Sequence, residues 1–179
     1  WEQVALPVLA RAEGVDLLHG LAFSVPMICS CPSVVTIFDM SFALFPQYHS
    51  PGRRIYLSLI TRLSARVARK VVAISQSTKR DVCRLLGVDD RKVEVIPCGV
   101  GERFQPLSEA EKRRFREEQG LGPYILYLGT IEPRKNLVRL VQAYARLRQG
   151  KHLPHKLILG GAPGWGYEET YAEVEHLGL

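Results

Sequence analysis

Four short runs of apolar, mostly β-branched residues recur along the first hundred positions of the chain. They span residues 15–18, 33–38, 71–74 and 93–96. Runs of this length and composition are typical of strands that are buried on both faces of a parallel sheet. Because segments of helical pattern separate the later runs, we predict an α/β fold with a doubly wound parallel sheet and right-handed crossovers.

The longest amphipathic segment follows Pro51 and Gly52 and runs from Arg53 to Arg69. Its apolar residues recur at every fourth position: Ile55, Leu59, Leu63 and Val67. This spacing places them along one face of a helix. We therefore expect this stripe to face the core and the basic residues to form the opposite, solvated face.

Two further helices are expected in this half of the chain. Residues 1–12 carry apolar side chains on a helical period. Between the third and fourth runs, Ser75 or Ser77 can cap a helix that ends at Leu86, and Gly87 suits its C-terminal end.

The character of the sequence changes after Val100. Residues 101–122 are polar and charged, and Ser108 and Glu111 have the spacing of a capping box for a helix that ends at Glu118. The α/β pattern then resumes, with strands at 124–128 and 156–159, loops at 129–135 and 160–166, and helices at 136–148 and from Tyr167.

We predict from this pattern two Rossmann-like domains in tandem. The first spans residues 1–105, a connecting segment spans 106–122, and the second domain begins within 123–179. Doubly wound domains commonly have about 100–200 residues each. Since the chain has 179 residues and starts at Trp1 rather than Met, we expect both domains to be incomplete in it.

The composition favours a soluble globular protein and excludes several other classes. Hydrophobic residues make up 46% of the chain and charged residues 23%, which argues against a disordered, collagen-like or disulfide-scaffold protein. No apolar run approaches the ~20 residues of a membrane-spanning helix. The four cysteines are expected to be reduced and mostly buried, because their spacing does not match a zinc site, although a redox or metal pair of Cys29 and Cys31 stays open.

The net charge of +6 is concentrated in one region. Residues 50–92 contain eleven Lys or Arg and three Asp, a net charge of +8. We favour a solvated helix surface for the helix from Arg53 to Lys70, and adhesion to anionic lipid head groups or capture of an anionic acceptor is the alternative. Nucleic acid is not an expected partner, since no recognition module or aromatic interleaving is present.

The most informative candidate site follows the strand at 124–128. Gly129 opens a tight turn, Arg134 and Lys135 provide two adjacent cations, and a helix begins beside them with Asn136 as its expected cap. Helix N-termini carry unpaired N–H groups and about half a positive charge. At the carboxyl end of a parallel strand, this combination predicts binding of a phosphate or diphosphate. The alternative is that the two cations only solvate a loop.

This segment resembles a known family, the GT-B glycosyltransferases of the large retaining family 4, especially its mannosyltransferase-like members. Their second domain opens with a strand followed by G-T-x-E-P-R-K-N-L, and residues 129–137 match this motif. Further matching segments follow the family's order: Asp39–Phe42, Ala73–Thr78, Val95–Val100 and Gly160–Glu168.

The resemblance implies a GT-B fold and transfer of a hexose, with retention, from a nucleotide-sugar donor to a glycan or lipid-linked acceptor. The first expected donor is GDP-mannose and the second a UDP-hexose; neither a metal nor another cofactor is expected. The resemblance assigns the donor phosphates to four residues, Gly129, Thr130, Arg134 and Lys135. It places Gly161 and Gly164 in a loop that borders the donor, where Trp165 is expected to pack rather than to stack on a base.

The chain departs from the family's pattern at two places in the first domain. Phe38 stands where the family usually has a His, and Cys98–Gly101 replaces the usual N-G-V-D. The catalytic residues are therefore not assigned; the candidates are His19 and Asp39, which have a structural histidine and a turn cap as their alternative interpretations. The family's acidic E-x7-E segment is expected beyond Leu179, and the 179 residues alone are expected to be inactive.

Two other functions stay open. A degenerate GT-B protein would bind a sugar nucleotide or a membrane without turnover, as the departures at 38 and 98–101 suggest. A GT-B sugar-nucleotide epimerase ranks below both, because the 129–137 motif is typical of transferases. We expect a cytoplasmic protein, with peripheral contact at the inner membrane face through the helix from Arg53 to Lys70 as the alternative.

Overall fold

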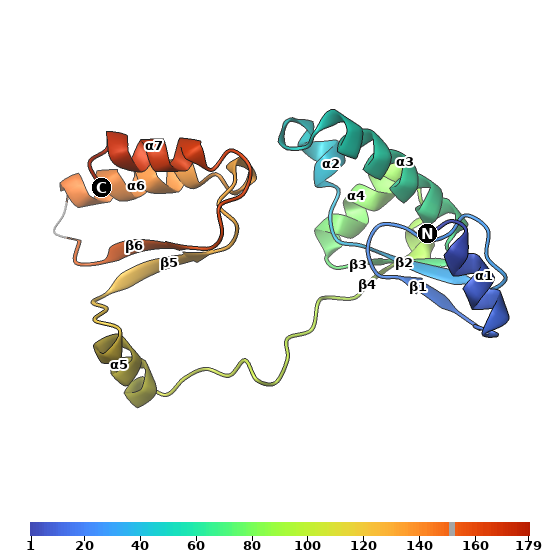
Figure 1. Ribbon diagram of the computed structural model, residues 1–179, viewed down its shortest axis with the longest axis horizontal. Helices are drawn as coiled ribbons and strands as arrows, with labels where there is room; N and C mark the ends of the chain where they lie inside the picture. Colours follow the sequence, from blue (N-terminus) through green and yellow to red (C-terminus); the bar gives the residue numbers. More distant parts are fainter. Residues whose placement is uncertain (151–152) are drawn as a thin grey trace. The chain divides into compact units, whose positions relative to one another are not determined.

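A computed structural model describes residues 1–150 and 153–179 of the chain. The chain forms two compact units, Trp1–Gly101 and Glu102–Leu179, each with its own parallel sheet and helices (Figure 1). Within the described residues, no helix is long and apolar enough to cross a bilayer.

The first unit contains a four-stranded sheet in which all neighbouring strands are parallel. Its strands are β1 (Leu18–Gly20), β2 (Ser33–Ile37), β3 (Lys70–Ala73) and β4 (Val93–Val95), in that spatial order. The apolar runs at 33–38, 71–74 and 93–96 correspond to β2, β3 and β4, and each strand ends one residue before its run does. The predicted parallel α/β architecture is therefore confirmed.

The first strand lies three residues later than predicted. The apolar run at 15–18 suggested a strand over those residues, but β1 begins at Leu18, which pairs with Ser33 of β2. Leu18 is buried, whereas Val15 and Leu17 are exposed. Pairing with β2 decides where the strand begins, and the apolar residues before Leu18 do not reach the sheet.

Four α-helices belong to this unit: α1 (Ala5–Ala12), α2 (Ser41–Leu44), α3 (Pro51–Val67) and α4 (Gln76–Leu86). The short α2 had no pattern that predicted it. Ser75 rather than Ser77 caps α4, because its hydroxyl oxygen accepts a hydrogen bond from the Thr78 N–H at 3.1 Å. Gly87 ends α4 with φ 69°, as expected.

The core of the first unit lies around β2 and β3. Five strand side chains are fully buried: Val35, Ile37, Val71, Ala73 and Val93. Phe42 of α2 joins the same cluster. A sheet so completely covered explains why its strands are continuous apolar runs.

The orientation of α3 differs from the prediction. Its buried residues are small, Thr61, Ser64 and Ala65, and the Ser64 hydroxyl accepts a 3.0 Å hydrogen bond from the Val25 N–H. The predicted core-facing stripe is exposed at Ile55, Leu59 and Val67 and half-buried at Leu63. Small side chains let the helix pack closely on the sheet, so the bulky side chains point away from it.

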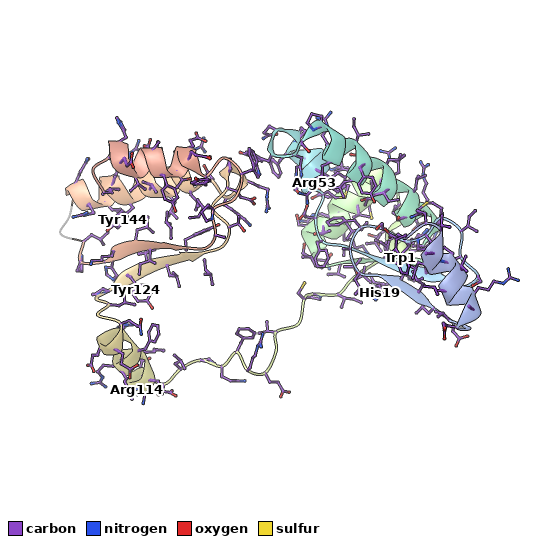
Figure 2. The ribbon with its side chains drawn as sticks, viewed as in Figure 1. Trp1, His19, Arg53, Arg114, Tyr124 and Tyr144 are labelled. Atoms are coloured by element: carbon purple, nitrogen blue, oxygen red, sulfur yellow. The ribbon has the colours of Figure 1, made fainter. Side chains whose placement is uncertain are left out.

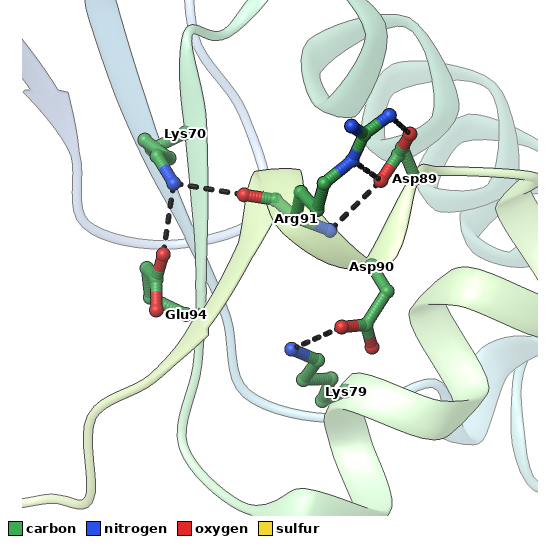
Figure 3. A network of polar contacts seen from close by, with 6 residues as sticks. All are labelled: Lys70, Lys79, Asp89, Asp90, Arg91 and Glu94. Carbon is green, nitrogen blue, oxygen red and sulfur yellow. Dashed lines mark hydrogen bonds and ion pairs between the residues drawn. The ribbon is translucent and has the colours of Figure 1, made fainter.

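A network of ion pairs occupies the region around β3 and β4 (Figure 3). Lys70 Nζ lies 2.8 Å from Glu94 Oε1, Lys79 Nζ lies 3.0 Å from Asp90, and Arg91 pairs with Asp89 at 2.9 Å. The hydrogen bonds from Arg91 lower the pKa of the Asp89 carboxyl to about 2. Acidic residues thus compensate part of the positive charge of residues 50–92.

The cysteines are less buried than expected. All four are free thiols; Cys98 is exposed, and Cys29, Cys31 and Cys83 are half-buried. The prediction of mostly buried thiols is wrong because these residues lie in loops and within α4 rather than in the strands that form the core.

The second unit contains α5 (Glu109–Glu118), β5 (Tyr124–Leu128), α6 (Leu137–Gly150), β6 (Lys156–Gly160) and α7 (Glu168–His176). The parallel strands β5 and β6 pair over their full length, with α6 and α7 on the same side of them (Figure 1). The capping box before α5 is confirmed: the N–H of Ser108 donates to Glu111 at 2.8 Å, and the N–H of Glu111 donates to the Ser108 hydroxyl.

Candidate functional site

The predicted phosphate-binding turn lies between β5 and α6, and two buried side chains hold it in place. Ile131 and Leu137 are almost fully buried, whereas Thr130, Arg134 and Lys135 between or beside them are exposed. Residues 133–135 form a single 3-10 turn. Burial of Ile131 and Leu137 therefore keeps the polar residues of the turn at the surface.

A second loop packs directly against this turn. A Cβ atom at Gly161 would collide with the carbonyl oxygen of Gly129, and one at Gly164 would lie 2.7 Å from Thr130 Cγ2. Main-chain hydrogen bonds join the loops: the Ile131 N–H donates to Ala162 at 3.0 Å. The structure thus brings four of the predicted donor-site residues together, and both glycines are required by close approach.

Tyr127 is a residue of this site that the sequence analysis did not single out. Its hydroxyl donates a 3.0 Å hydrogen bond to the carbonyl oxygen of Thr130. A Cβ at Gly129 would lie 2.9 Å from the same hydroxyl oxygen. A tyrosine near the carboxyl end of an apolar strand was the available signal, because its hydroxyl needs a polar partner.

The two cations of the turn differ in their surroundings. Arg134 lies 2.7 Å from Glu132 Oε1, and that carboxylate is mostly buried. Lys135 is exposed and forms no ion pair within residues 1–150 and 153–179. Glu132 therefore partly compensates Arg134 and orients it, while the full charge of Lys135 remains available to an anion.

Asn136 lies at the position directly before α6, where the sequence predicts the cap of this helix. It adopts a left-handed conformation with φ 57° after the 3-10 turn, and α6 begins at Leu137. Its carbonyl oxygen accepts the N–H of Leu140 at 3.4 Å. The N-terminus of α6 lies just after Lys135 and Asn136 along the chain. Its first N–H groups and its partial positive charge also favour binding of an anion at this turn.

Trp165 is more exposed than expected. It is 54% exposed and stands between Gly164 and Gly166, which contact Thr130 and Pro133. The expected packing of Trp165 is not seen within the described residues, because more than half of its side chain is open to solvent. A large aromatic surface therefore lies in the loop that borders the cations.

The two catalytic candidates of the first unit each have a structural partner. His19 Nε2 lies 2.9 Å from the Thr36 hydroxyl, and the side chain is exposed. Asp39 Oδ1 accepts a 2.8 Å hydrogen bond from the Ser41 N–H at the start of α2. His19 lies in β1 (Figure 2), and Asp39 follows the end of β2. Both therefore lie toward the edge where ligands of parallel sheets bind.

Phe38 belongs to an aromatic cluster that the sequence analysis did not anticipate. Its ring centroid lies 6.1 Å from that of Phe23, which in turn lies 6.2 Å from Phe42. Phe23 has φ 63°, and a Cβ at Gly20 would collide with the carbonyl oxygen of Ser24. The loop after β1 is therefore held tightly against Phe38, whose ring offers an apolar surface at this edge.

The family model "Glycosyltransferase Family 4" matches residues 1–103 of the chain. Among curated relatives, O-antigen chain mannosyltransferase B from Escherichia coli is 29% identical over 161 residues. The 2-deoxystreptamine glucosyltransferase from Streptomyces kanamyceticus is 28% identical over 170 residues. These alignments cover 89% and 91% of the chain, but only 42% and 40% of the relatives.

Solved structures show the same fold. The Anabaena protein Alr3699/HepE in complex with UDP-glucose has a TM-score of 0.71 at 21% identity, over 96% of this chain and 48% of its own. A glycosyltransferase from Rickettsia africae ESF-5 has a TM-score of 0.63 at 18% identity, over 97% of this chain and 47% of its own. The expected α/β fold of GT-B type is confirmed, and the chain spans about half the length of these proteins.

Proposed function

The chain belongs to Glycosyltransferase Family 4, and on that premise we propose that it is part of a retaining glycosyltransferase. The enzyme moves a hexose from a nucleotide-sugar donor to a glycan or lipid-linked acceptor. The observation that carries the proposal is the paired loop structure at the ends of β5 and β6, where Lys135 lies exposed and uncompensated in the described residues.

In this proposal the turn at 129–135 binds the donor diphosphate. Departure of the sugar leaves negative charge on the phosphate oxygens, and fixed positive groups stabilise that charge. Lys135 supplies a full charge, Arg134 is held by Glu132, and α6 adds its N-terminal N–H groups. Gly129 and Gly161 let the two loops pack closely, and the Thr130 side chain beside them is exposed. The protein's own cations thus take the role that a metal has in other transferases.

For the donor we propose GDP-mannose first and a UDP-hexose second. The relatives from Escherichia coli favour mannose, since they include O-antigen chain mannosyltransferase B and a serotype-specific mannosyltransferase, WbdA. The Anabaena structures contain UDP, or UDP-glucose, and favour the second. Isothermal calorimetry with both nucleotides and both nucleotide sugars separates these alternatives.

The test of the phosphate assignment is Lys135→Ala in the full-length protein. Loss of one charge-assisted contact of about 1.5–3 kcal/mol raises the Kd of the donor roughly 10- to 100-fold. Lys112→Ala in α5 is the matched control, since it removes the same group from an exposed helix where Lys112 pairs with Glu109. Equal donor affinity in the Lys135→Ala variant and the parent would remove the assignment.

The second candidate function is a member that binds a sugar nucleotide without turnover. The aromatic cluster at Phe38 favours it, because a phenyl ring in place of a histidine neither donates nor accepts a hydrogen bond. The discriminating assay follows release of the free nucleotide in the presence of candidate acceptors. Donor binding with no release supports this second function, whereas a changed sugar with the nucleotide still attached would indicate an epimerase.

We also propose that the protein works in the cytoplasm and contacts the inner face of the membrane. Two considerations support this location. A lipid-linked acceptor would present its sugar at a membrane surface, and the net charge of +8 over residues 50–92 attracts anionic head groups. Fractionation of cells into cytosol and washed membranes, probed for this protein, checks the location.

A further inference from the structure

The solvent-facing side of α3 combines bulky apolar residues with arginines. Ile55 is 63% exposed, Leu59 is 59% exposed, and Tyr56 and Val67 are exposed as well. Leu59 lies four residues after Ile55, three after Tyr56 and eight before Val67, so these positions share one side of the helix. The opposite side provides the contacts with the sheet through Thr61, Ser64 and Ala65. The exposed apolar side is therefore not needed to hold α3 in the unit.

The charges of α3 are of one sign. Its 17 residues include four arginines and no acidic residue: Arg53, Arg54, Arg62 and Arg66 are the charged positions. None of the four forms an ion pair within the part of the chain that the structure describes. Lys70, Lys79 and Arg91, close by in the sequence, are all paired with acids (Figure 3). Of the seven Lys or Arg of residues 50–92 that form no ion pair in the described residues, four therefore lie on α3.

The position of the first two arginines strengthens this observation. Arg53 (labelled in Figure 2) and Arg54 lie in the first turn of α3, where the helix already carries its partial positive charge. No acidic residue is present in that turn. Cations at this end cost stability in an isolated helix. An anionic surface outside the protein would compensate both the arginines and the helix end.

We propose that α3 lies in the plane of an anionic membrane with this side inserted at the boundary between head groups and acyl chains. Ile55, Tyr56 and Leu59 bury their side chains there, and the arginines bind lipid phosphates. This inference rests on the membrane contact of the proposed function and adds that the helix binds by inserting apolar side chains. The apolar and basic residues thus act together on the exposed part of α3, whereas the sequence predicted them on opposite faces. A second copy of the chain is a poor occupant, because four arginines would face four arginines.

The insertion test uses a tryptophan placed on α3. The variant Leu59→Trp is made together with Trp1→Phe and Trp165→Phe, which removes the chain's other two tryptophans. Vesicles of phosphatidylcholine with phosphatidylglycerol are expected to shift its emission to the blue, and lipids brominated on the acyl chain are expected to quench it. Binding with no quenching would mean adhesion to the head groups alone and would overturn the insertion.

The affinity test compares two double variants by vesicle flotation. Ile55→Ser with Leu59→Ser removes the apolar contacts and is expected to weaken binding at least about tenfold, at low and at high salt. Val4→Ser with Val8→Ser, at exposed positions in and just before α1, is the matched control and should bind as the parent does.

Arg62→Glu with Arg66→Glu should abolish binding at low salt, because the charge is reversed. Equal binding of the α3 serine variant and the parent would refute the proposal.

Two readouts separate this proposal from its alternatives. Light scattering after size exclusion should give the same mass for parent and α3 serine variant; a dimer that the serines dissociate would assign the surface to a second copy. Calorimetry with nucleotide sugars should give equal donor affinity in both. Vesicle binding without donor binding would refute the proposed transferase function and leave the α3 proposal standing. Donor binding without vesicle binding would refute the α3 proposal and leave the transferase function standing.

Discussion

The strands β2 and β5 have similar apolar sequences but very different surroundings. In β2 every residue is buried or half-buried. In β5 the residues Ile125, Leu126 and Leu128 are exposed, and Leu128 reaches 79%. The apolar run predicts both strands correctly over most of their length. The apolar run does not indicate how many helices and neighbouring strands cover the strand.

The covering elements explain this difference. β2 lies between β1 and β3, and Ala10 of α1, Phe42 of α2 and Ala65 of α3 join its core cluster. Within residues 102–150 and 153–179, β5 pairs only with β6, and α6 and α7 pack on the same side (Figure 1). Parallel sheets normally have both faces covered. The two units therefore derive their stability from different numbers of buried apolar contacts.

The largest effect that would sharpen this comparison comes from truncating one side chain in each sheet. Ile37→Ala in β2 leaves a cavity in a filled core and should lower the free energy of unfolding of the first unit by about 3–4 kcal/mol. Leu128→Ala in β5 should cost under about 0.5 kcal/mol, because little buried surface is lost. Urea unfolding followed by hydrogen exchange of peptides from each unit measures both, and equal losses would contradict the comparison.

A smaller effect concerns the glycines that join the loops of the second unit. Gly161→Ala should lower the stability of this unit by about 2–3 kcal/mol, because its methyl group meets the carbonyl oxygen of Gly129. Gly120→Ala is the control: that residue also has a positive φ, of 60°, but nothing lies within 4 Å of its Cβ, so its cost is about 1 kcal/mol. If both variants lose the same free energy of unfolding, the two loops do not approach each other as closely as described.

The smallest effect is the pH dependence of the ion pair between Asp89 and Arg91 in the first unit. The pKa of Asp89 is lowered from 3.8 to about 2, so its carboxylate stabilises the fold above about pH 4. This contribution disappears as the pH falls from 4 to 2. The stability difference between the parent and Asp89→Asn should therefore shrink over that window in urea titrations. A stability difference that stays constant from pH 4 to pH 2 would contradict this prediction.

Local signals predicted the elements well where the interactions are themselves local. Ser75 and Gly87 delimit α4 as their residue types require, and Ser108 with Glu111 forms the expected capping box. The motif at 129–137 led to the correct turn, because a strand, a glycine and a following helix leave few local conformations. These interactions join residues a few positions apart, so the order of residues contains them.

Long-range interactions account for the errors. The four-residue spacing of apolar side chains identified α3 as a helix but assigned its buried side wrongly. Residues 55–61 contain no charged group, so charge did not distinguish the side of Leu59 from the side of Thr61. Trp165 was expected to pack and the cysteines to be mostly buried, but Trp165 and Cys98 are exposed. Their hydrophobic character was read correctly, but the packing partners that would bury them come from distant segments and are not present around them.

The sequence by itself determined the alternation of strands and helices, the parallel sheet and the two cations at the start of α6, because hydrophobic periodicity and turn chemistry act within about ten residues. Only the tertiary structure decided that Glu132 compensates Arg134 while Lys135 stays unpaired in the described chain, that Gly161 meets Gly129, and that α3 turns Ile55 and Leu59 toward solvent. Those outcomes depend on which surfaces pack best against one another, and small residues pack closest.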